Sequence, residues 1–105
     1  MDVTPTQRSL AHLRREGYEV AIVEHWNSFI RRRQDLFGII DLLAVRDGET
    51  LAVQTTSGSN VSARVRKIAE AEITPTLRKA GWTLHVHGWR KGANGRWALR
   101  VVDVS

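Results

Sequence analysis

Two apolar-rich runs in the middle of the chain, separated by a turn signal, predict a β-hairpin, and the first run is apolar on both faces, as in a central strand covered by helices. Asp47-Gly48 lies between the runs and is the residue pair that a two-residue type I′ turn requires. This turn places Asp41 opposite Gln54, and directly opposed residues share one face of a sheet with Cβ atoms about 4.5 to 5.5 Å apart. Thr56 follows two positions further along that face. The pattern therefore predicts that Asp41, Gln54 and Thr56 lie together.

The N-terminal pattern predicts a helix followed by a strand. Thr4 and Gln7 form a capping box around Pro5, which suits the first helical position, and Gly17 ends the helix. The next apolar run predicts a strand centred on Val20–Val23. We expect the basic segment that follows, residues 27–38, to be a loop.

The second half of the chain predicts helix and then hairpin. Residues 59–82 are helical in pattern: apolar residues keep a helical period from Val65 to Ala80, Gly81 ends the helix, and Thr74-Pro75 either kinks one helix or begins a second. Residues 82–89 and 96–104 alternate as two strands joined by a glycine-containing turn. The whole order predicts a single α+β domain spanning residues 1–105, with a central sheet flanked by helices.

Composition changes this picture by indicating a polyanionic partner. Sixteen Lys and Arg against eleven Asp and Glu give a net charge of +5, and thirteen of the sixteen are Arg. Guanidinium groups pair with phosphates through two hydrogen bonds, although the charge could serve only to keep the protein soluble. The chain has no cysteine, no signal-like N-terminus and no apolar run near the roughly 18 residues that span a bilayer. We therefore expect a cytoplasmic protein without a membrane partner.

The element order, with the aspartate of "GIID" entering the hairpin at Asp41, resembles the PD-(D/E)XK nuclease superfamily. Archaeal-type Holliday junction resolvases, Mrr-like enzymes and small phage-encoded relatives are the most similar branches. The family's acid-x-Lys acid falls on Gln54, as in Mrr-like Gln-x-Lys, and its lysine falls on Thr56, which departs from the pattern. The first-helix acid of the family falls near Gln7. The resemblance implies a restriction-endonuclease-like αβββαββ core with a mixed sheet, in a protein encoded by a bacterium or phage.

The resemblance also implies a divalent metal site for Mg²⁺ or Mn²⁺. Its ligands would be the Asp41 carboxylate, the Gln54 side-chain oxygen and the Thr55 backbone carbonyl, because hard cations prefer oxygen ligands. One formal negative charge predicts weak binding that a DNA phosphate completes. The missing lysine could come from the following helix, where we favour Lys67 over Arg64 because an ammonium can share its proton. Glu24 is either a second carboxylate or a strand-end charge.

Hydroxyl, amide and guanidinium groups on both sides of the hairpin predict a nucleic-acid face, since they hydrogen-bond phosphate oxygens. Some of the polar residues instead have a structural explanation, as turn residues or as a helix N-cap at Ser59 or Ser62. The residues assigned to this face are Arg31, Arg32, Arg33, Thr56, Ser57, Asn60, Arg64 and Arg66.

The C-terminal hairpin offers weaker candidates. His85 and His87 share one strand face and could bind zinc, but no third ligand has a suitable spacing, so we expect surface contacts or partial burial. Trp82, Trp89 and Trp97 should pack in the core or a dimer interface, with stacking on unpaired bases as the alternative.

These features together predict a metal-dependent DNA endonuclease that hydrolyses phosphodiesters, resolvase-like or otherwise structure-selective. Asp41, Gln54 and Lys67 would be its catalytic residues. A homodimer is implied by the resemblance, because two cuts need two sites. The alternatives are a non-catalytic DNA-binding domain that kept the nuclease fold and a phage inhibitor that binds another protein. The choice between DNA and RNA stays open.

Overall fold

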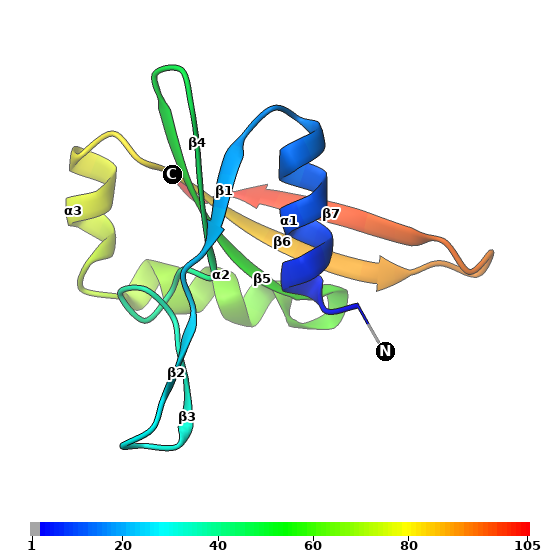
Figure 1. The fold of residues 1–105 in the computed structure, drawn as a ribbon, viewed down its shortest axis with the longest axis horizontal. Helices are drawn as coiled ribbons and strands as arrows, with labels where there is room; N and C mark the ends of the chain where they lie inside the picture. Colours follow the sequence, from blue (N-terminus) through cyan, green and yellow to red (C-terminus); the bar gives the residue numbers. More distant parts are fainter. Residues whose placement is uncertain (1–2) are drawn as a thin grey trace.

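A five-stranded sheet of order β1-β4-β5-β6-β7 forms the centre of the molecule in a computed structural model, which describes residues 3–105 (Figure 1). β5 and β6 run parallel and the other neighbours antiparallel, so the sheet is mixed, and the α+β prediction is confirmed. The elements in chain order are α1 (Pro5–Arg15), β1 (Glu19–Ile22), β2 (His25–Asn27), β3 (Arg32–Gln34), β4 (Leu42–Arg46), β5 (Glu49–Ser57), η1 (Gly58–Asn60), α2 (Val61–Glu70), α3 (Thr74–Lys79), β6 (Thr83–Lys91) and β7 (Trp97–Asp103).

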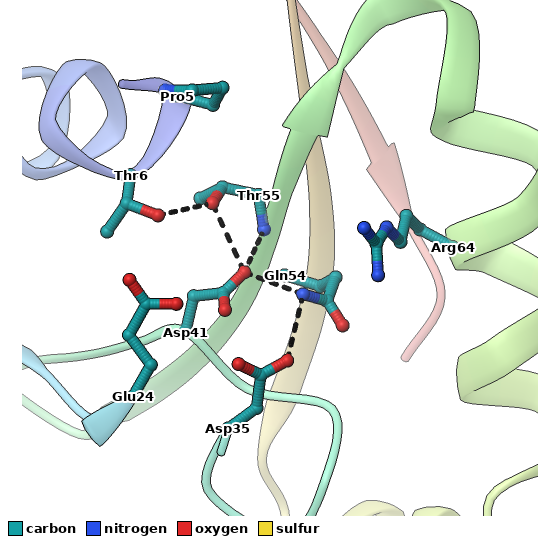
Figure 2. A pocket seen from close by; sticks show the side chains of 8 residues that line it. All are labelled: Pro5, Thr6, Glu24, Asp35, Asp41, Gln54, Thr55 and Arg64. Carbon is teal, nitrogen blue, oxygen red and sulfur yellow. Dashed lines mark hydrogen bonds between the residues drawn. The ribbon is translucent and has the colours of Figure 1, made fainter. Parts of the chain in front are cut away.

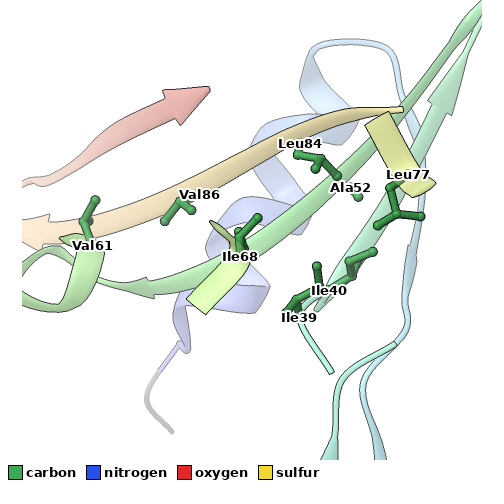
Figure 3. Close-up of a cluster of buried hydrophobic side chains, with 8 residues drawn as sticks. All are labelled: Ile39, Ile40, Ala52, Val61, Ile68, Leu77, Leu84 and Val86. Carbon is green, nitrogen blue, oxygen red and sulfur yellow. The ribbon is translucent and has the colours of Figure 1, made fainter. Parts of the chain in front are cut away.

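Two apolar clusters sit on opposite faces of this sheet, because successive residues of a strand point to opposite sides. One cluster lies under α1, where Leu13 packs with Leu42 and Val53. The other lies under α2 and α3 and includes Ile68 and Leu77 (Figure 3). No helix within residues 3–105 is long and apolar enough to cross a membrane.

Both ends of the predicted local structure around α1 are as expected. Thr4 Oγ1 accepts a hydrogen bond from the Gln7 backbone N–H at 3.1 Å, and Gln7 Oε1 accepts one from the Thr4 N–H at 3.1 Å. This reciprocal box satisfies two N–H groups that a helix start leaves without partners. Gly17 follows the helix with φ +93°, a conformation that glycine adopts without strain. Gln7 is therefore a capping residue.

The register of the β4–β5 hairpin follows the prediction made from its turn. Leu43 pairs with Ala52 and Arg46 pairs with Glu49, which leaves Asp47 and Gly48 as the two turn residues. Gly48 has φ +68°, but Asp47 is not among the residues with positive φ, and a type I′ turn requires positive φ at both central residues. The predicted turn type is therefore wrong, although the two-residue length of the turn and the register are as predicted. Because a shift of one residue would send every side chain to the other face, this register decides which side chains reach the site.

The chain breaks at Thr74-Pro75 into two helices. α2 ends at Glu70, and the Thr74 hydroxyl, which is fully buried, donates to the Ile68 carbonyl at 2.5 Å. Pro75 lies in the first turn of α3, where its missing N–H has no cost. The predicted N-cap of α2 at Ser59 or Ser62 is wrong: Asn60 occupies that position, after the 3₁₀ turn η1, and no side chain caps it.

The segment expected to be a loop forms a second, two-stranded sheet instead. β2 and β3 pair only with each other, antiparallel, and the hairpin projects away from the main sheet (Figure 1). Its strands carry mainly polar and charged residues without the alternation that marks a half-buried strand, so the pattern gave no strand signal.

Candidate functional site

Three acidic side chains converge at one end of the main sheet, where β1, the β2–β3 hairpin and β4 meet (Figure 2). One carboxylate oxygen from each of Glu24, Asp35 and Asp41 lies within 4.8 Å of the others, and in Figure 2 the three side chains point toward one another. They line a pocket of about 270 Å³, whose wall is otherwise polar. The further lining residues are Pro5, Thr6, Gln54, Thr55 and Arg64.

The β2–β3 hairpin brings two of these acids together. Its register pairs His25 with Gln34 at the base of the hairpin. Glu24 precedes β2 and Asp35 follows β3, so both lie just beyond this pair, on the side away from the tip. Opposed residues of an antiparallel pair are neighbours, so the ladder itself delivers Glu24 and Asp35 to one place. The sequence pattern predicts no role for Asp35, and of the two roles open to Glu24 the structure agrees with a second carboxylate beside Asp41.

Asp41 is held by the main sheet. Its backbone N–H donates to the Val53 carbonyl at 2.9 Å, and its carbonyl accepts from the Val23 N–H at 2.9 Å. The chain is thus bonded to β5 on one side and to the end of β1 on the other. Ile39 and Ile40, the two residues just before Asp41, are buried in the core and anchor this part of the chain. The side chain of Asp41 is 4 % exposed.

The Asp41 carboxylate receives hydrogen bonds from two residues of β5. Oδ2 accepts from Gln54 Nε2 at 2.6 Å, from the Thr55 backbone N–H at 2.7 Å and from the Thr55 hydroxyl at 3.1 Å. Because the Thr55 hydroxyl donates its proton there, it accepts from Thr6 Oγ1 of α1, at 2.7 Å. The first helix therefore reaches the site through Thr6, and not through Gln7.

Burial and mutual repulsion disfavour the ionised forms of Asp35 and Asp41. Burial, followed by the hydrogen bond and charge of Asp41, raises the pKa of Asp35 to about 6. Burial also raises the pKa of Asp41, against the opposing effect of the Thr55 N–H. A bound cation would stabilise the ionised forms of neighbouring carboxylates that otherwise repel each other, so the cluster favours positive charge at its centre.

Two cations of the chain approach the cluster. Lys67 Nζ of α2 lies 3.7 Å from Asp35 Oδ2, with the lysine side chain 40 % exposed, and Arg33 Nη1 lies 3.9 Å from Glu24 Oε1. Arg64, one turn earlier on α2, lines the pocket (Figure 2). The predicted positive group of α2, Lys67, is therefore at ion-pair distance from Asp35, an acid that the prediction did not include, and its catalytic role stays a prediction.

Gln54 lies where the turn arithmetic placed it, but with its nitrogen toward the acids. Nε2 donates to Asp41 and, at 3.4 Å, to Asp35, while Oε1 is buried without a hydrogen-bond partner. Two carboxylates facing an amide favour its N–H groups. The predicted role of the Gln54 oxygen as a metal ligand is therefore not supported by this orientation, and Gln54 positions the two carboxylates instead.

Thr55 presents its backbone to the acids. Its N–H donates to Asp41, and the N–H and C=O of one residue point to the same side of a strand, so its carbonyl faces the site as well. The donor set available to a metal is then three carboxylates with a backbone carbonyl beside them. All are hard oxygen ligands, which suits a divalent cation such as Mg²⁺ or Mn²⁺.

The residues assigned to a nucleic-acid face have different positions. Arg31, Arg32 and Arg33 are exposed on the β2–β3 hairpin, and Arg33 Nη1 lies 3.9 Å from Glu24 Oε1. Arg66 is exposed on α2, and Arg64 is half-buried at the pocket.

Polar residues after β5 divide between surface and core. Ser57 and Asn60 are exposed and hydrogen-bond to each other, Asn60 Nδ2 donating to Ser57 Oγ at 3.1 Å. Thr56 is only 4 % exposed, because β5 is a central strand covered on both faces. The prediction that Thr56 contacts a phosphate is wrong for this reason.

His87 is more deeply buried than predicted and belongs to a hydrogen-bond network with α1, whereas His85 is half-buried, as predicted. His87 is 1 % exposed, and its Nδ1 lies 2.9 Å from the hydroxyl of Ser9 on α1. Trp89 Nε1 can only donate, and it does so to the same hydroxyl at 2.8 Å, so Ser9 donates to a neutral His87. Burial lowers the pKa of His87 to about 4. Among residues 3–105, Glu24, Asp35 and Asp41 form the one group of three potential metal ligands.

The three tryptophans differ in burial. Trp89 is buried, and Trp82 packs at the edge of the core beneath α3, as expected for core residues. Trp97 is 44 % exposed on β7, where the Arg8 guanidinium lies 3.9 Å from the ring centroid. The tryptophans therefore do not form one surface.

No model of a known protein family matches the chain, and no curated protein is significantly similar to it. The chemistry of the acid cluster is thus the main guide to function.

A signal for Asp35 exists in the sequence. Asp35 is the one acidic residue between Glu24 and Asp41, and it lies in an otherwise basic segment.

Proposed function

We propose that the chain is a divalent-metal-dependent DNA endonuclease with a PD-(D/E)XK-like fold. The observation that carries the proposal is the convergence of the Glu24, Asp35 and Asp41 carboxylates within 4.8 Å, at the end of the central hairpin and beside Lys67. Phosphodiester hydrolysis needs both parts of this arrangement, a place for a cation and a nearby positive group that can face the phosphate.

The order of elements supports the restriction-endonuclease-like core. With the β2–β3 hairpin treated as an insertion, the chain reads as a helix, three strands, two helices and two strands, in a mixed sheet. Asp41 enters the second strand of this core, and Gln54 and Thr55 lie opposite it on the third. This layout supports membership of the superfamily, although Gln54 and Thr56 depart from its acid-x-Lys motif.

Glu24, Asp35 and Asp41 would hold the metal, for which we propose Mg²⁺ or Mn²⁺. Three carboxylates offer more negative charge than the single one counted from the hairpin, so binding should be tighter than the sequence alone suggested. A cation bound there would withdraw charge from a phosphate oxygen and make a coordinated water more acidic.

The remaining site residues would orient the reactants. Gln54 and Thr55 fix the Asp41 carboxylate through three hydrogen bonds, and Thr6 fixes the Thr55 hydroxyl in turn. Lys67 would stabilise the negative charge that develops on the phosphate as water attacks phosphorus and the bond to the leaving sugar oxygen breaks. The Lys67 ammonium lies 3.7 Å from Asp35 Oδ2, so a phosphate bound at the acid cluster would be within its reach.

A non-catalytic DNA-binding domain is the second candidate, and the residues at the family motif favour it. Gln54 and Thr56 stand where an acid and a lysine would be, and Thr56 is buried, so neither restores the motif. In that case the exposed arginines of the β2–β3 hairpin would bind DNA, and the acid cluster would be a remnant.

A cleavage panel separates the two candidates. Single-stranded, duplex, flap and four-way DNA would be incubated with Mg²⁺ or Mn²⁺, using the wild-type chain, Asp35→Asn and Asp41→Asn. Asp47→Asn is the matched control, because asparagine suits a tight turn as aspartate does and residue 47 lies at the far end of the hairpin. We expect cleavage by wild type and control only. Full cleavage by Asp41→Asn would refute the nuclease, and binding in EDTA without cleavage in either metal would favour the second candidate.

A further inference from the structure

The tip of the β2–β3 hairpin carries large apolar side chains in water. Phe29 is 98 % exposed, Trp26 is 59 % exposed and Ile30 is 44 % exposed. Single exposed apolar residues are ordinary, but three within five positions on a projecting hairpin are a concentrated patch, and such patches mark interaction sites. The hairpin pairs with no strand of the main sheet.

Hydrogen bonds hold this tip in a defined shape. Asn27 Oδ1 accepts from the backbone N–H groups of Phe29, at 2.9 Å, and Ile30, at 3.3 Å, while Asn27 Nδ2 donates to Gln34 Oε1 at 2.8 Å. Arg31 closes the turn with φ +53°, which is uncommon for a residue other than glycine. This backbone conformation reverses the chain directly after Phe29 and Ile30.

Positive charge borders the apolar tip. Arg31, Arg32 and Arg33 follow directly, and all three are exposed. A flat apolar group next to several cations complements a nucleic acid, whose stacked bases are flat and apolar and whose backbone is anionic. A second copy of this chain would be a poor occupant, because it would bring two sets of arginines together.

The hairpin also has a fixed relation to the acid cluster, since Glu24 and Asp35 lie at its base. Phe29 is five residues from Glu24, so at a strand rise of about 3.3 Å per residue the apex is at most roughly 16 Å from the acids, and less because residues 28–31 turn. With about 3.4 Å per base step along one strand, that distance covers at most roughly five steps.

We infer that the β2–β3 hairpin is a wedge that inserts Phe29 at an interrupted base stack while Arg31–Arg33 hold the flanking phosphates. This inference rests on the proposed function, because it names what the same site recognises. It makes Phe29 a specificity-determining residue. Cleavage is then expected within roughly five nucleotides of the interruption, the largest number of base steps that the hairpin length spans.

The test measures unstacking without cleavage. A duplex with one unpaired 2-aminopurine, and the same duplex fully paired, would be titrated with protein in EDTA, and 2-aminopurine fluorescence would report loss of stacking. The variants are Phe29→Ala and Phe29→Trp, with Trp97→Ala as the control for loss of an exposed aromatic residue far from the hairpin. Phe29 is almost wholly exposed, so its substitution should leave folding intact.

We expect wild type, Trp97→Ala and Phe29→Trp to raise the fluorescence of the interrupted duplex. Phe29→Ala should lose that rise and bind about tenfold more weakly, as loss of one base–aromatic stack implies. Equal unstacking by Phe29→Ala and wild type would overturn the inference, as would equal binding of both duplexes by wild type. A wild-type dimer that Phe29→Ala converts to monomer would assign the tip to self-association and also overturn it. Unstacking without cleavage in metal would leave the wedge standing and reject the nuclease.

Discussion

Asp35→Asn should stabilise the protein at neutral pH while removing its response to metal. The pKa of Asp35 is raised from 3.8 to about 6 by burial and by Asp41, so its ionised form is disfavoured in the folded state. Asparagine has nearly the same shape and carries no charge. The substitution therefore removes the repulsion within the cluster and leaves the packing unchanged.

The size of the effect follows from the shift in the pKa of Asp35. A shift of this size corresponds to about 3 kcal/mol if fully expressed, and solvent screening of a half-buried carboxylate reduces it to roughly 1 to 2 kcal/mol. For a domain of this length, each kcal/mol changes the melting temperature by about 4 to 8 °C. Loss of the Lys67 contact should matter little, because exposed ion pairs contribute about 1 kcal/mol or less.

The sign of the pH dependence gives a second check. Because the folded pKa of Asp35 lies above the unfolded one, the native state binds a proton more tightly. The cost of ionised Asp35 is therefore full above about pH 6 and disappears as the pH falls toward 4. The advantage of Asp35→Asn over wild type should shrink over the same interval.

Urea unfolding followed by circular dichroism, in EDTA and in Mn²⁺, measures both effects. Mn²⁺ should raise the unfolding free energy of wild type and of Asp47→Asn, and change Asp35→Asn much less, because a ligand stabilises only the state that binds it. A lower stability of Asp35→Asn at neutral pH in EDTA would refute the reasoning. So would an advantage that persists unchanged at about pH 4.

Three further predictions concern single residues. His87 is buried and neutral, with a pKa of about 4. In the Asp35→Asn background, the unfolding free energy should therefore fall by up to about 3 kcal/mol as the pH decreases from 6.5 to 4, because the unfolded state binds the proton more tightly. His87→Asn should flatten that pH dependence in urea titrations. Gln54→Glu adds a fourth carboxylate and should lower stability in EDTA by about 1 kcal/mol or more while increasing the Mn²⁺-induced gain; no change in either would remove Gln54 from the site. Lys67→Gln should slow DNA cleavage at least tenfold with an unchanged Mn²⁺-induced gain, and equal cleavage rates would exclude its role beside the phosphate.

Local chemistry made the β4–β5 hairpin predictable from sequence. Asp47-Gly48 marks a two-residue turn, the length of the turn sets the register, and the register puts Asp41 opposite Gln54. The turn type did not follow, because Asp47 keeps a negative φ where a type I′ turn needs a positive one. The capping box at Thr4 is equally local, because all of its partners lie within one helical turn. Both needed no knowledge of the rest of the molecule.

The missed parts of the site depend on tertiary contacts. Asp35 reaches Asp41 only because an exposed, polar hairpin with no apolar alternation returns the chain to Glu24. Thr56 looked available because its neighbours are polar, but β6 pairs alongside it and buries it. The amide orientation of Gln54 likewise follows from the arrival of a second carboxylate, which its own strand does not reveal.

The two ends of the acid cluster have different architectural origins. Asp41 belongs to the main sheet, whereas the spacing of Glu24 and Asp35 is set by the His25–Gln34 pair at the foot of the small hairpin. Residues beyond that pair are free to change in length and chemistry without moving a carboxylate. Under the proposals above, exchange of the tip should alter what the hairpin contacts and leave the carboxylates of Glu24 and Asp35 in place.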